Sequence, residues 1–177
     1  VNDAPVLSAI DNQSIDEDTD LVYSLSGTDV DDVDLSYSVT IDGNATVSLE
    51  TSNLNITPIL NYNGNINVSV TVSDGELTDT QDFVLTVNPI NDNPVLTNIL
   101  NENIDEDNVF NYELLAVDID NIDLSYSAAV NGNASVLVVD STLSITPDLN
   151  YYGTIDIVAS VSDGELTDSG SFTLTVN

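Results

Sequence analysis

Polar and apolar residues alternate with a period of two along much of this chain. The clearest run spans residues 65–73, in which the apolar positions are Ile66, Val68, Val70 and Val72. Alternation of this kind is typical of a strand that buries one face. Turn signals rich in Gly, Asn, Asp and Pro separate the runs, and no stretch shows helical periodicity. The pattern predicts an all-β protein.

The first half of the chain holds about seven such runs, at the spacing typical of a β-sandwich. We therefore predict an antiparallel, seven-stranded Greek-key sandwich, with a small barrel as the alternative. Residues 15–18 are interpreted as an acidic turn between strands. The expected strands are residues 6–10, 21–25, 35–39, 47–49, 54–56, 66–72 and 83–87.

The second half repeats the first with a constant offset and no insertion. Pro5 recurs as Pro94 and Glu17 as Glu106, each 89 residues later. The segment VNPINDNPV at 87–95 also echoes the opening VNDAPV. Self-similarity at a fixed period indicates an array of like modules. We predict two tandem seven-stranded Greek-key β-sandwich domains, residues 1–88 and 89–177, with a linker around 88–94, and expect them to belong to a longer series.

Tyr62 and its repeat Tyr151 each lie beside a turn that contains glycine, just before the longest strand. They resemble a tyrosine corner, in which the phenol hydroxyl bonds to nearby backbone. An aromatic side chain that covers the end of the core is the alternative interpretation.

The charge of the chain excludes several classes of partner. It holds 31 Asp and Glu residues and no Lys, Arg or His, so its formal net charge is −31. No side-chain salt bridge is possible within it. Nucleic acid is excluded because phosphate binding requires cationic side chains. An anionic membrane surface is disfavoured for the same reason, and no apolar run is long enough for membrane insertion. Cations, basic surfaces and neutral ligands remain.

The absence of Cys and His narrows the chemistry further. Without cysteine the chain has no disulfide, thiolate site or iron–sulfur cluster. Without imidazole or thiolate ligands, Zn²⁺, Cu²⁺ and iron sites are disfavoured. Most pairs of nucleophile and base are also missing, because His, Cys and Lys are absent. A pair of carboxylates can in principle hydrolyse a glycoside, but the repeated acids lie in loops and not in an evident cleft. We do not expect an enzyme.

Four acidic motifs occur in the same order in both halves. In the first half they are the VNDAP opening, Glu17–Asp18, the DxD loop from Asp29 to Asp31, and the SDG turn at Asp74. Together they resemble the cadherin module, and more closely the bacterial cadherin-like, Ig-like repeats of large surface adhesins. The resemblance covers essentially the whole chain. It implies Ca²⁺ ligands at the junction between consecutive domains.

Carried over by position, the resemblance implies one junction site and two half sites. The upstream half site awaits a preceding module, and Glu106 awaits a following one. The implied ligands of the junction are Glu17, Asn91, Asp92, the carbonyl of Asn93, Asp118, Asp120 and Asp163. Those of the upstream half site are Asp3, Asp29, Asp31 and Asp74.

The chain departs from the animal cadherin pattern at three points. Asn88 stands where those proteins open the linker with Asp, and the spacing from Asn88 to Asn91 is one residue longer. The second acidic pair of the upstream domain is missing, since residues 58–62 contain Asn61 and no acid. We therefore expect fewer ions per junction than the three of animal cadherins.

The physical case for a cation stands beside the resemblance. Two unit charges about 4 Å apart repel by roughly 4 kcal/mol at an effective dielectric constant near 20. Loops that converge several carboxylates therefore favour a hard cation. Ca²⁺ accepts six to eight oxygen ligands, whereas Mg²⁺ requires a tighter octahedral geometry. Ca²⁺ is the expected cofactor, and solvated carboxylates are the alternative.

Other acids have a simpler interpretation. A first group falls on strand faces or edges, where we expect solvated charge: Glu50, Asp82, Glu113, Asp140 and Asp156. A second group recurs in both halves and is expected to cap turns: Asp34, Asp123, Asp79 and Asp168.

These observations favour an extracellular structural and adhesion module. Its tandem spacer repeats would be stiffened by Ca²⁺ in the linker, as part of a larger secreted, cell-surface adhesin. The expected partners are adjacent repeats of the same polypeptide, other adhesin copies, and cell-surface or matrix ligands. The alternative is a Ca²⁺-dependent carbohydrate- or protein-binding module of a secreted protein. The acidity can also serve as an adaptation to salt, which does not explain its recurrence in the same loops.

Overall fold

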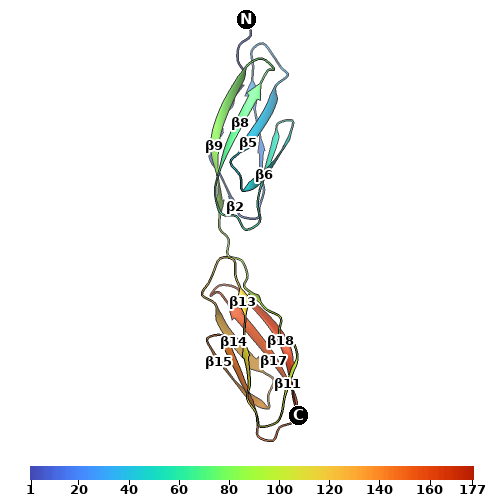
Figure 1. The fold of residues 1–177 in the computed structure, drawn as a ribbon. Helices are drawn as coiled ribbons and strands as arrows, with labels where there is room; N and C mark the ends of the chain where they lie inside the picture. Colours follow the sequence, from blue (N-terminus) through green and yellow to red (C-terminus); the bar gives the residue numbers. More distant parts are fainter. The chain divides into compact units, whose positions relative to one another are not determined.

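The computed structural model describes every residue from Val1 to Asn177 and divides into two compact units. Unit 1 is Val1–Ile90 and unit 2 is Asn91–Asn177, so the division falls inside the expected linker, residues 88–94. Both units are all-β (Figure 1). The structure contains no helix, and therefore none that could cross a membrane.

Unit 1 is a sandwich of two sheets with a short two-stranded ladder. The four-stranded sheet has the order β2-β9-β8-β5, the three-stranded sheet has the order β3-β7-β6, and β1 pairs with β4. The bounds are β1 Val6–Leu7, β2 Gln13–Asp16, β3 Leu21–Ser24, β4 Gly27–Thr28, β5 Ser36–Ile41, β6 Ala45–Glu50, β7 Asn53–Pro58, β8 Gly64–Ser73 and β9 Thr78–Asn88.

Unit 2 repeats this topology strand for strand. Its sheets have the orders β11-β18-β17-β14 and β12-β16-β15, and β10 pairs with β13. The bounds are β10 Val95–Leu96, β11 Glu102–Ile104, β12 Phe110–Glu113, β13 Ala116–Val117, β14 Ser125–Val130, β15 Ala134–Val139, β16 Thr142–Pro147, β17 Gly153–Ser162 and β18 Thr167–Val176.

The alternation along the strands fills one core per unit. On β8 the inward-facing side chains of Ile66, Val68, Val70 and Val72 are each at most 1% exposed. They belong to the core cluster of unit 1, and the corresponding side chains of β17 belong to a separate cluster in unit 2. Burial of this apolar surface is the main stabilising contribution to each unit.

Two features of the sheets differ from the sequence prediction. The turn expected at residues 15–18 begins with the end of a strand, since β2 runs from Gln13 to Asp16. The sandwich is also not wholly antiparallel, because β2 pairs with β9 in parallel. In unit 2, β11 pairs with β18 in the same way. With Ile15 as its only large apolar residue, β2 is too short to show a strand period, and its pairing depends on the tertiary fold.

The two repeated tyrosines fix the turn before the longest strand. Tyr62 donates its hydroxyl to the carbonyl of Asn65 at 3.0 Å, and Tyr151 donates to that of Thr154 at 2.9 Å. These carbonyls lie after the tyrosine in the chain, whereas in a tyrosine corner they lie before it. Both rings also pack against the core of their unit. A side chain at Gly64 would place its Cβ 3.0 Å from the Tyr62 hydroxyl, so this turn requires glycine.

Candidate metal-binding loops

The loop after β13 is organised by one aspartate. The Oδ1 of Asp118 accepts the backbone N–H of Asp120 and of Asn121, both at 2.8 Å. This Asx-type arrangement closes the loop without any regular secondary structure. The other carboxylate oxygen, Oδ2, is shielded from solvent and has no hydrogen-bond partner. A shielded, charged oxygen without a donor is unfavourable, so this atom is a candidate ligand for a cation.

The start of unit 2 is held against this loop by two further hydrogen bonds. The backbone N–H of Asp92 donates to Oδ2 of Asp120 at 2.8 Å. The side-chain amide of Asn121 donates to Oδ1 of Asn91, also at 2.8 Å. The linker residues and the DxD loop therefore form one connected set of oxygen-bearing groups in unit 2.

A second loop, between β17 and β18, joins the same set through Asp163. Its Oδ1 accepts the N–H of Glu165 and of Leu166 at 2.7 Å each, and its Oδ2 accepts the side-chain amide of Asn91 at 2.7 Å. These bonds favour the charged form. They lower the pKa of Asp163 below its usual value, with the Leu166 N–H as the largest cause and the Asn91 amide as the next.

Unit 1 repeats much of this arrangement around Asp29. Oδ1 of Asp29 accepts the N–H of Asp31 at 2.7 Å, and Oδ2 is again shielded and without a hydrogen-bond partner. The N–H of Asp3 donates to Asp31 at 2.9 Å. Asp74 accepts the side-chain amide of Asn2 at 2.9 Å. The backbone N–H groups of its turn, led by that of Leu77, lower the pKa of Asp74.

Glu17 is the only buried acid of the chain and lies directly after β2. Its side chain is 5% exposed, and Oε1 accepts the backbone N–H of Ile90 at 2.5 Å. Its own N–H donates to the carbonyl of Asn88 at 2.9 Å. In unit 2, Glu106 also donates its N–H to the end of the last strand, at Asn177, but its side chain is exposed. The linker residue Ile90 is therefore tied to Glu17 through its backbone N–H.

Within unit 2 the structure brings together most of the ligands implied for the junction. Asn93 is exposed and its side chain makes no hydrogen bond, but its expected ligand atom is the backbone carbonyl, so that expectation stays a prediction. Sequence analysis missed two amides, Asn121 and Asn2, that bond directly within the loop sets. Neither amide belongs to the ligand set that the resemblance implies, although Asn2 is the equivalent of Asn91, 89 residues earlier. The expected members in unit 2 are Asn91, Asp92, Asp118, Asp120 and Asp163.

The expected crowding of carboxylates is not observed. No group of three or more acidic side chains lies close enough to hold a metal ion by itself. Backbone and amide N–H groups separate the acids and occupy oxygens of Asp120 and Asp163. Each loop set thus offers a mixture of carboxylate and amide oxygens, and hard divalent cations such as Ca²⁺ bind oxygen ligands of this kind.

Of the four acids expected to cap turns, Asp34 and Asp123 make no side-chain hydrogen bond, so that prediction is wrong for them, whereas Asp79 and Asp168 have a structural role. Asp79 accepts the N–H of Leu7 at 2.8 Å, and Asp168 accepts that of Leu96 at the same distance. These bonds fix the first short strand of each unit to the body of the sandwich. Neither residue forms part of the candidate loops.

Comparison with protein families assigns a domain type to each unit. Residues 2–86 match the family model described as a bacterial Ig domain. Residues 90–177 match the model described as a cadherin-like domain. The two matches together cover nearly the whole chain, and residues 87–89 lie between them. No curated protein sequence matches significantly.

Solved cadherin structures share the fold. Human protocadherin-24 EC1-2 matches with a TM-score of 0.60 and 18% identity, over 97% of this chain and 97% of that chain. Drosophila N-cadherin EC1-4 matches with a TM-score of 0.59 and 14% identity, over 99% of this chain and 50% of that chain. At such identities the likeness concerns the fold alone.

A third match is to part of a larger protein. An endo-fucoidan hydrolase from glycoside hydrolase family 107 matches with 17% identity and a TM-score of 0.42. The match covers 98% of this chain but 28% of the hydrolase, so the chain spans less than a third of that protein.

Proposed function

Because this chain is a tandem of a bacterial Ig domain and a cadherin-like domain, we propose that it is a Ca²⁺-binding spacer of an extracellular adhesin. Domains of these two types are usually extracellular and typically non-catalytic. Specifically, we propose that a divalent ion binds at the acidic loops and stiffens the linker between the repeats.

The observation that carries the proposal is the burial of Oδ2 of Asp118 without a hydrogen-bond donor. This oxygen is shielded, charged and without a hydrogen-bond partner, and the equivalent atom of Asp29 is the same. The chain contains no Lys, Arg or His that could compensate the charge. A bound Ca²⁺ would supply the positive charge that the chain itself lacks, and its preferred ligands are oxygens.

The residues that would hold the ion come from both sides of the linker. In unit 2 they are the loop set around Asp118, Asp120 and Asp163 with the linker residues from Asn91 to Asn93. In unit 1 the proposed ligand is Glu17, whose Oε1 accepts the N–H of Ile90. Ile90 and Asn91 are consecutive, so an ion bound by both sets would restrict the backbone torsions between them. The upstream half site, Asp3, Asp29, Asp31 and Asp74, and the downstream Glu106 would serve neighbouring repeats in the same way.

The first test measures stabilisation of unit 2 by Ca²⁺. A ligand that binds the folded state at a concentration 100 times its Kd adds about 2.7 kcal/mol to the free energy of unfolding. Extracellular Ca²⁺ modules typically bind at about 0.1–1 mM, so 10 mM Ca²⁺ is about 10 to 100 times the Kd and adds about 1.4–2.7 kcal/mol. We expect Asp118→Ala to reduce the Ca²⁺-dependent rise in the Tm of unit 2, because it removes the orphaned oxygen.

The control for this test lies in the same loop. Asp123 is exposed and makes no side-chain hydrogen bond. Asp123→Ala removes the same charge and should leave the Ca²⁺-dependent rise in Tm unchanged. Equal effects of the two variants would show that Ca²⁺ acts through general charge screening, and would remove Asp118 from the site.

The second test addresses the linker directly. Small-angle scattering of the chain should give a narrower distribution of dimensions in Ca²⁺ than in a chelator. The Glu17→Gln variant should reduce that difference. Identical scattering in Ca²⁺ and in chelator would refute the stiffening role, even if the ion binds. The proposed setting is the cell surface, where the partners are neighbouring repeats, other adhesin copies, and surface or matrix ligands.

A further inference from the structure

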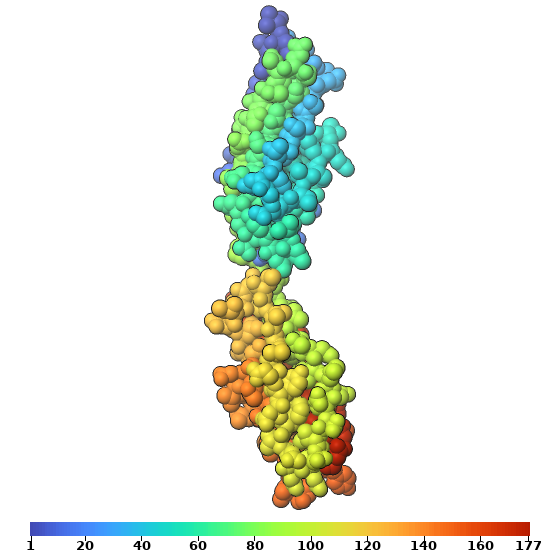
Figure 2. Space-filling view, viewed as in Figure 1, coloured from blue at the N-terminus to red at the C-terminus, as the bar shows by residue number.

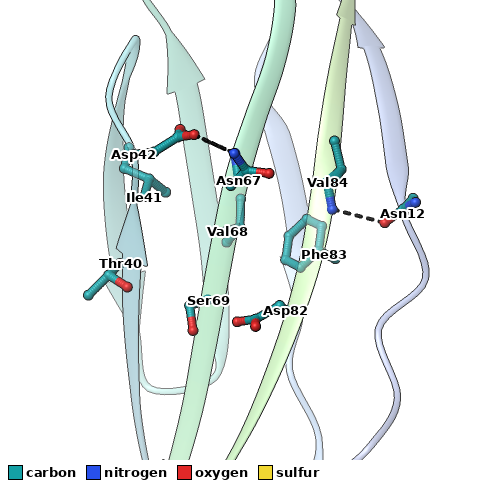
Figure 3. A pocket seen from close by; sticks show the side chains of 10 residues that line it. All are labelled: Asn12, Thr40, Ile41, Asp42, Asn67, Val68, Ser69, Asp82, Phe83 and Val84. Carbon is teal, nitrogen blue, oxygen red and sulfur yellow. Dashed lines mark hydrogen bonds between the residues drawn. The ribbon is translucent and has the colours of Figure 1, made fainter.

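Unit 1 carries a hollow of about 550 Å³ on the outer face of its four-stranded sheet. It lies over β5, β8 and β9, with Asn12 at its margin near β2 (Figure 3). The segments that contain β5 and β8 lie side by side on the face of unit 1 shown in Figure 2. The volume falls within the roughly 300–1,000 Å³ usual for small-molecule sites. None of the candidate Ca²⁺ ligands lines this hollow.

A row of three polar side chains crosses the floor of the hollow. Thr40 is the direct cross-strand partner of Ser69, and Ser69 is that of Asp82. Their side chains form no hydrogen bond with the rest of the chain, and Thr40 and Asp82 are exposed. Directly opposed residues on a sheet have Cβ atoms about 4.5–5.5 Å apart. Two hydroxyls and one carboxylate therefore present free hydrogen-bonding capacity side by side.

An acid–amide pair also lines the hollow. Asp42 accepts the side-chain amide of Asn67 at 2.6 Å and its backbone N–H at 3.2 Å. Next to this pair Val84, which is opposite Asn67 in the sheet, adds an apolar surface. The N–H of Val84 is itself bound by the side chain of Asn12 at 2.9 Å, which fixes the backbone there (Figure 3). The hollow thus combines two carboxylates, two hydroxyls and the apolar side chain of Val84.

Unit 2 shows that the fold does not require this chemistry. At the positions equivalent to Thr40, Ser69 and Asp82, 89 residues later, unit 2 has Ala129, Val158 and Ser171. Val158 is 47% exposed, so unit 2 has an apolar side chain at the position where unit 1 has Ser69. The polar row is therefore a property of unit 1 alone and not of the repeat.

We propose that this hollow binds a saccharide that carries a free amino group. Its ammonium would pair with the carboxylate of Asp82, and its hydroxyls would exchange hydrogen bonds with Thr40 and Ser69. The C–H face of a sugar ring would lie against Val84. The charge decides between sugar classes, because a chain with no cationic side chain opposes sulfated and uronic acid sugars. The site is independent of the proposed Ca²⁺ loops, so binding should persist in chelator.

The test uses the ¹⁵N-labelled 177-residue chain at pH 6 in physiological salt and chelator. The probe is methyl glucosaminide, whose single charge limits non-specific attraction to so acidic a chain. Methyl glucoside matches its hydroxyls without the amine, and ethanolamine matches its amine without the ring. We expect the amino sugar to shift amide signals around Thr40, Ser69 and Asp82, and to bind more tightly than either control compound. The amides around Ala129, Val158 and Ser171 are the internal control.

A variant of unit 1 that carries the three residue types of unit 2 tests whether the polar row forms the binding site. Thr40→Ala, Ser69→Val and Asp82→Ser together should abolish the localised shifts, and distant amides of unit 1 will report that the fold persists. Asp82→Asn alone should weaken binding by about two- to fivefold, as is usual for an exposed ion pair. The proposal is wrong if the triple variant binds as before, if unit 2 responds equally, or if no localised shift occurs. It is also wrong if ethanolamine or methyl glucoside matches the amino sugar.

Discussion

Each unit pairs one acidic and one amide side chain at the same two positions, but the acid and the amide are exchanged between the units. In unit 1 Asp42 accepts the side-chain amide of Asn67, whereas in unit 2 Asn131 donates its side-chain amide to Asp156. The positions correspond residue for residue. In both units the second residue of the pair also donates its backbone N–H to the first, at 3.2 Å. Each unit therefore has one acid and one amide at this point, and the acid lies directly after β5 in unit 1 but on β17 in unit 2.

The two units also differ in the aromatic residues of their cores. Unit 2 has Phe110 where unit 1 has Leu21, and its ring lies 6.1 Å from those of Tyr112 and Phe172. Unit 1 has one ring pair in this region, Tyr23 with Phe83, at 6.5 Å. Aromatic clusters of this kind add stabilisation beyond the area that they bury.

The largest expected effect tests this difference between the cores. Phe110→Ala should lower the free energy of unfolding of unit 2 by about 3–5 kcal/mol, because it removes a buried ring and two ring contacts. Leu21→Ala, the matched change, should cost unit 1 about 2–5 kcal/mol. Hydrogen exchange of strand amides, read separately for each unit, measures both. If either substitution destabilised both units alike, the two cores would not be independent.

A smaller effect tests the exchanged pair. Asn131→Asp should destabilise unit 2 by about 1 kcal/mol, because it replaces a donor with a second carboxylate opposite Asp156. Adding Asp156→Asn recreates the order found in unit 1 and should recover most of the loss. Urea unfolding of the single and double variants measures the coupling. Failure of the double variant to recover would mean that the exchange depends on other neighbours, such as Thr173, which also donates to Asp156.

The smallest expected effect is a difference between the two SDG turns in how far a neighbouring amide lowers the pKa of the aspartate. The pKa of Asp163 and that of Asp74 are both lowered in the folded state. Each charged carboxylate therefore adds stability above the unfolded pKa near 3.9, and this is lost as the pH falls through the lowered folded value. The Asn91 amide is the second largest cause at Asp163, whereas the Asn2 amide contributes less at Asp74.

Asn91→Ala should accordingly raise the pKa of Asp163 more than Asn2→Ala raises that of Asp74. Titration of the carboxyl carbon signals below pH 5 measures both changes. Equal changes would indicate that the backbone N–H groups of the turns hold both carboxylates and that the amides contribute little.

The sequence predicted the long strands well because their alternation reports directly on burial. Strands β8 and β17 carry four inward apolar residues each, and both were expected. Strand β2 was missed because the four residues Gln13–Asp16 carry too few apolar positions, and its parallel pairing depends on contacts with β9. The two-residue strands β4 and β13 have no periodicity to read.

The candidate loops were predicted from four recurring acidic motifs and the family that they resemble, and a motif that recurs cannot show residues that differ between the repeats. This approach found Asp118, Asp120 and Asp163, which the structure connects through hydrogen bonds. It missed Asn121, since unit 1 has Asp32 at that position and the residue type does not recur. It also could not show that N–H donors separate the acids, because a backbone donor has no signature in the sequence.

The parallel pairing of β2 with β9 has a mechanical consequence. In the sequence, β2 lies near the first residue of unit 1 and β9 near its last, and hydrogen bonds join Gln13–Asp16 to Leu85–Asn88. A tensile load on the ends of the unit would slide one strand lengthwise along the other. The hydrogen bonds between the two strands would then resist the load together. In a hairpin pulled from its open end, by contrast, they would break one after another. Unit 2 has the same geometry in β11 and β18.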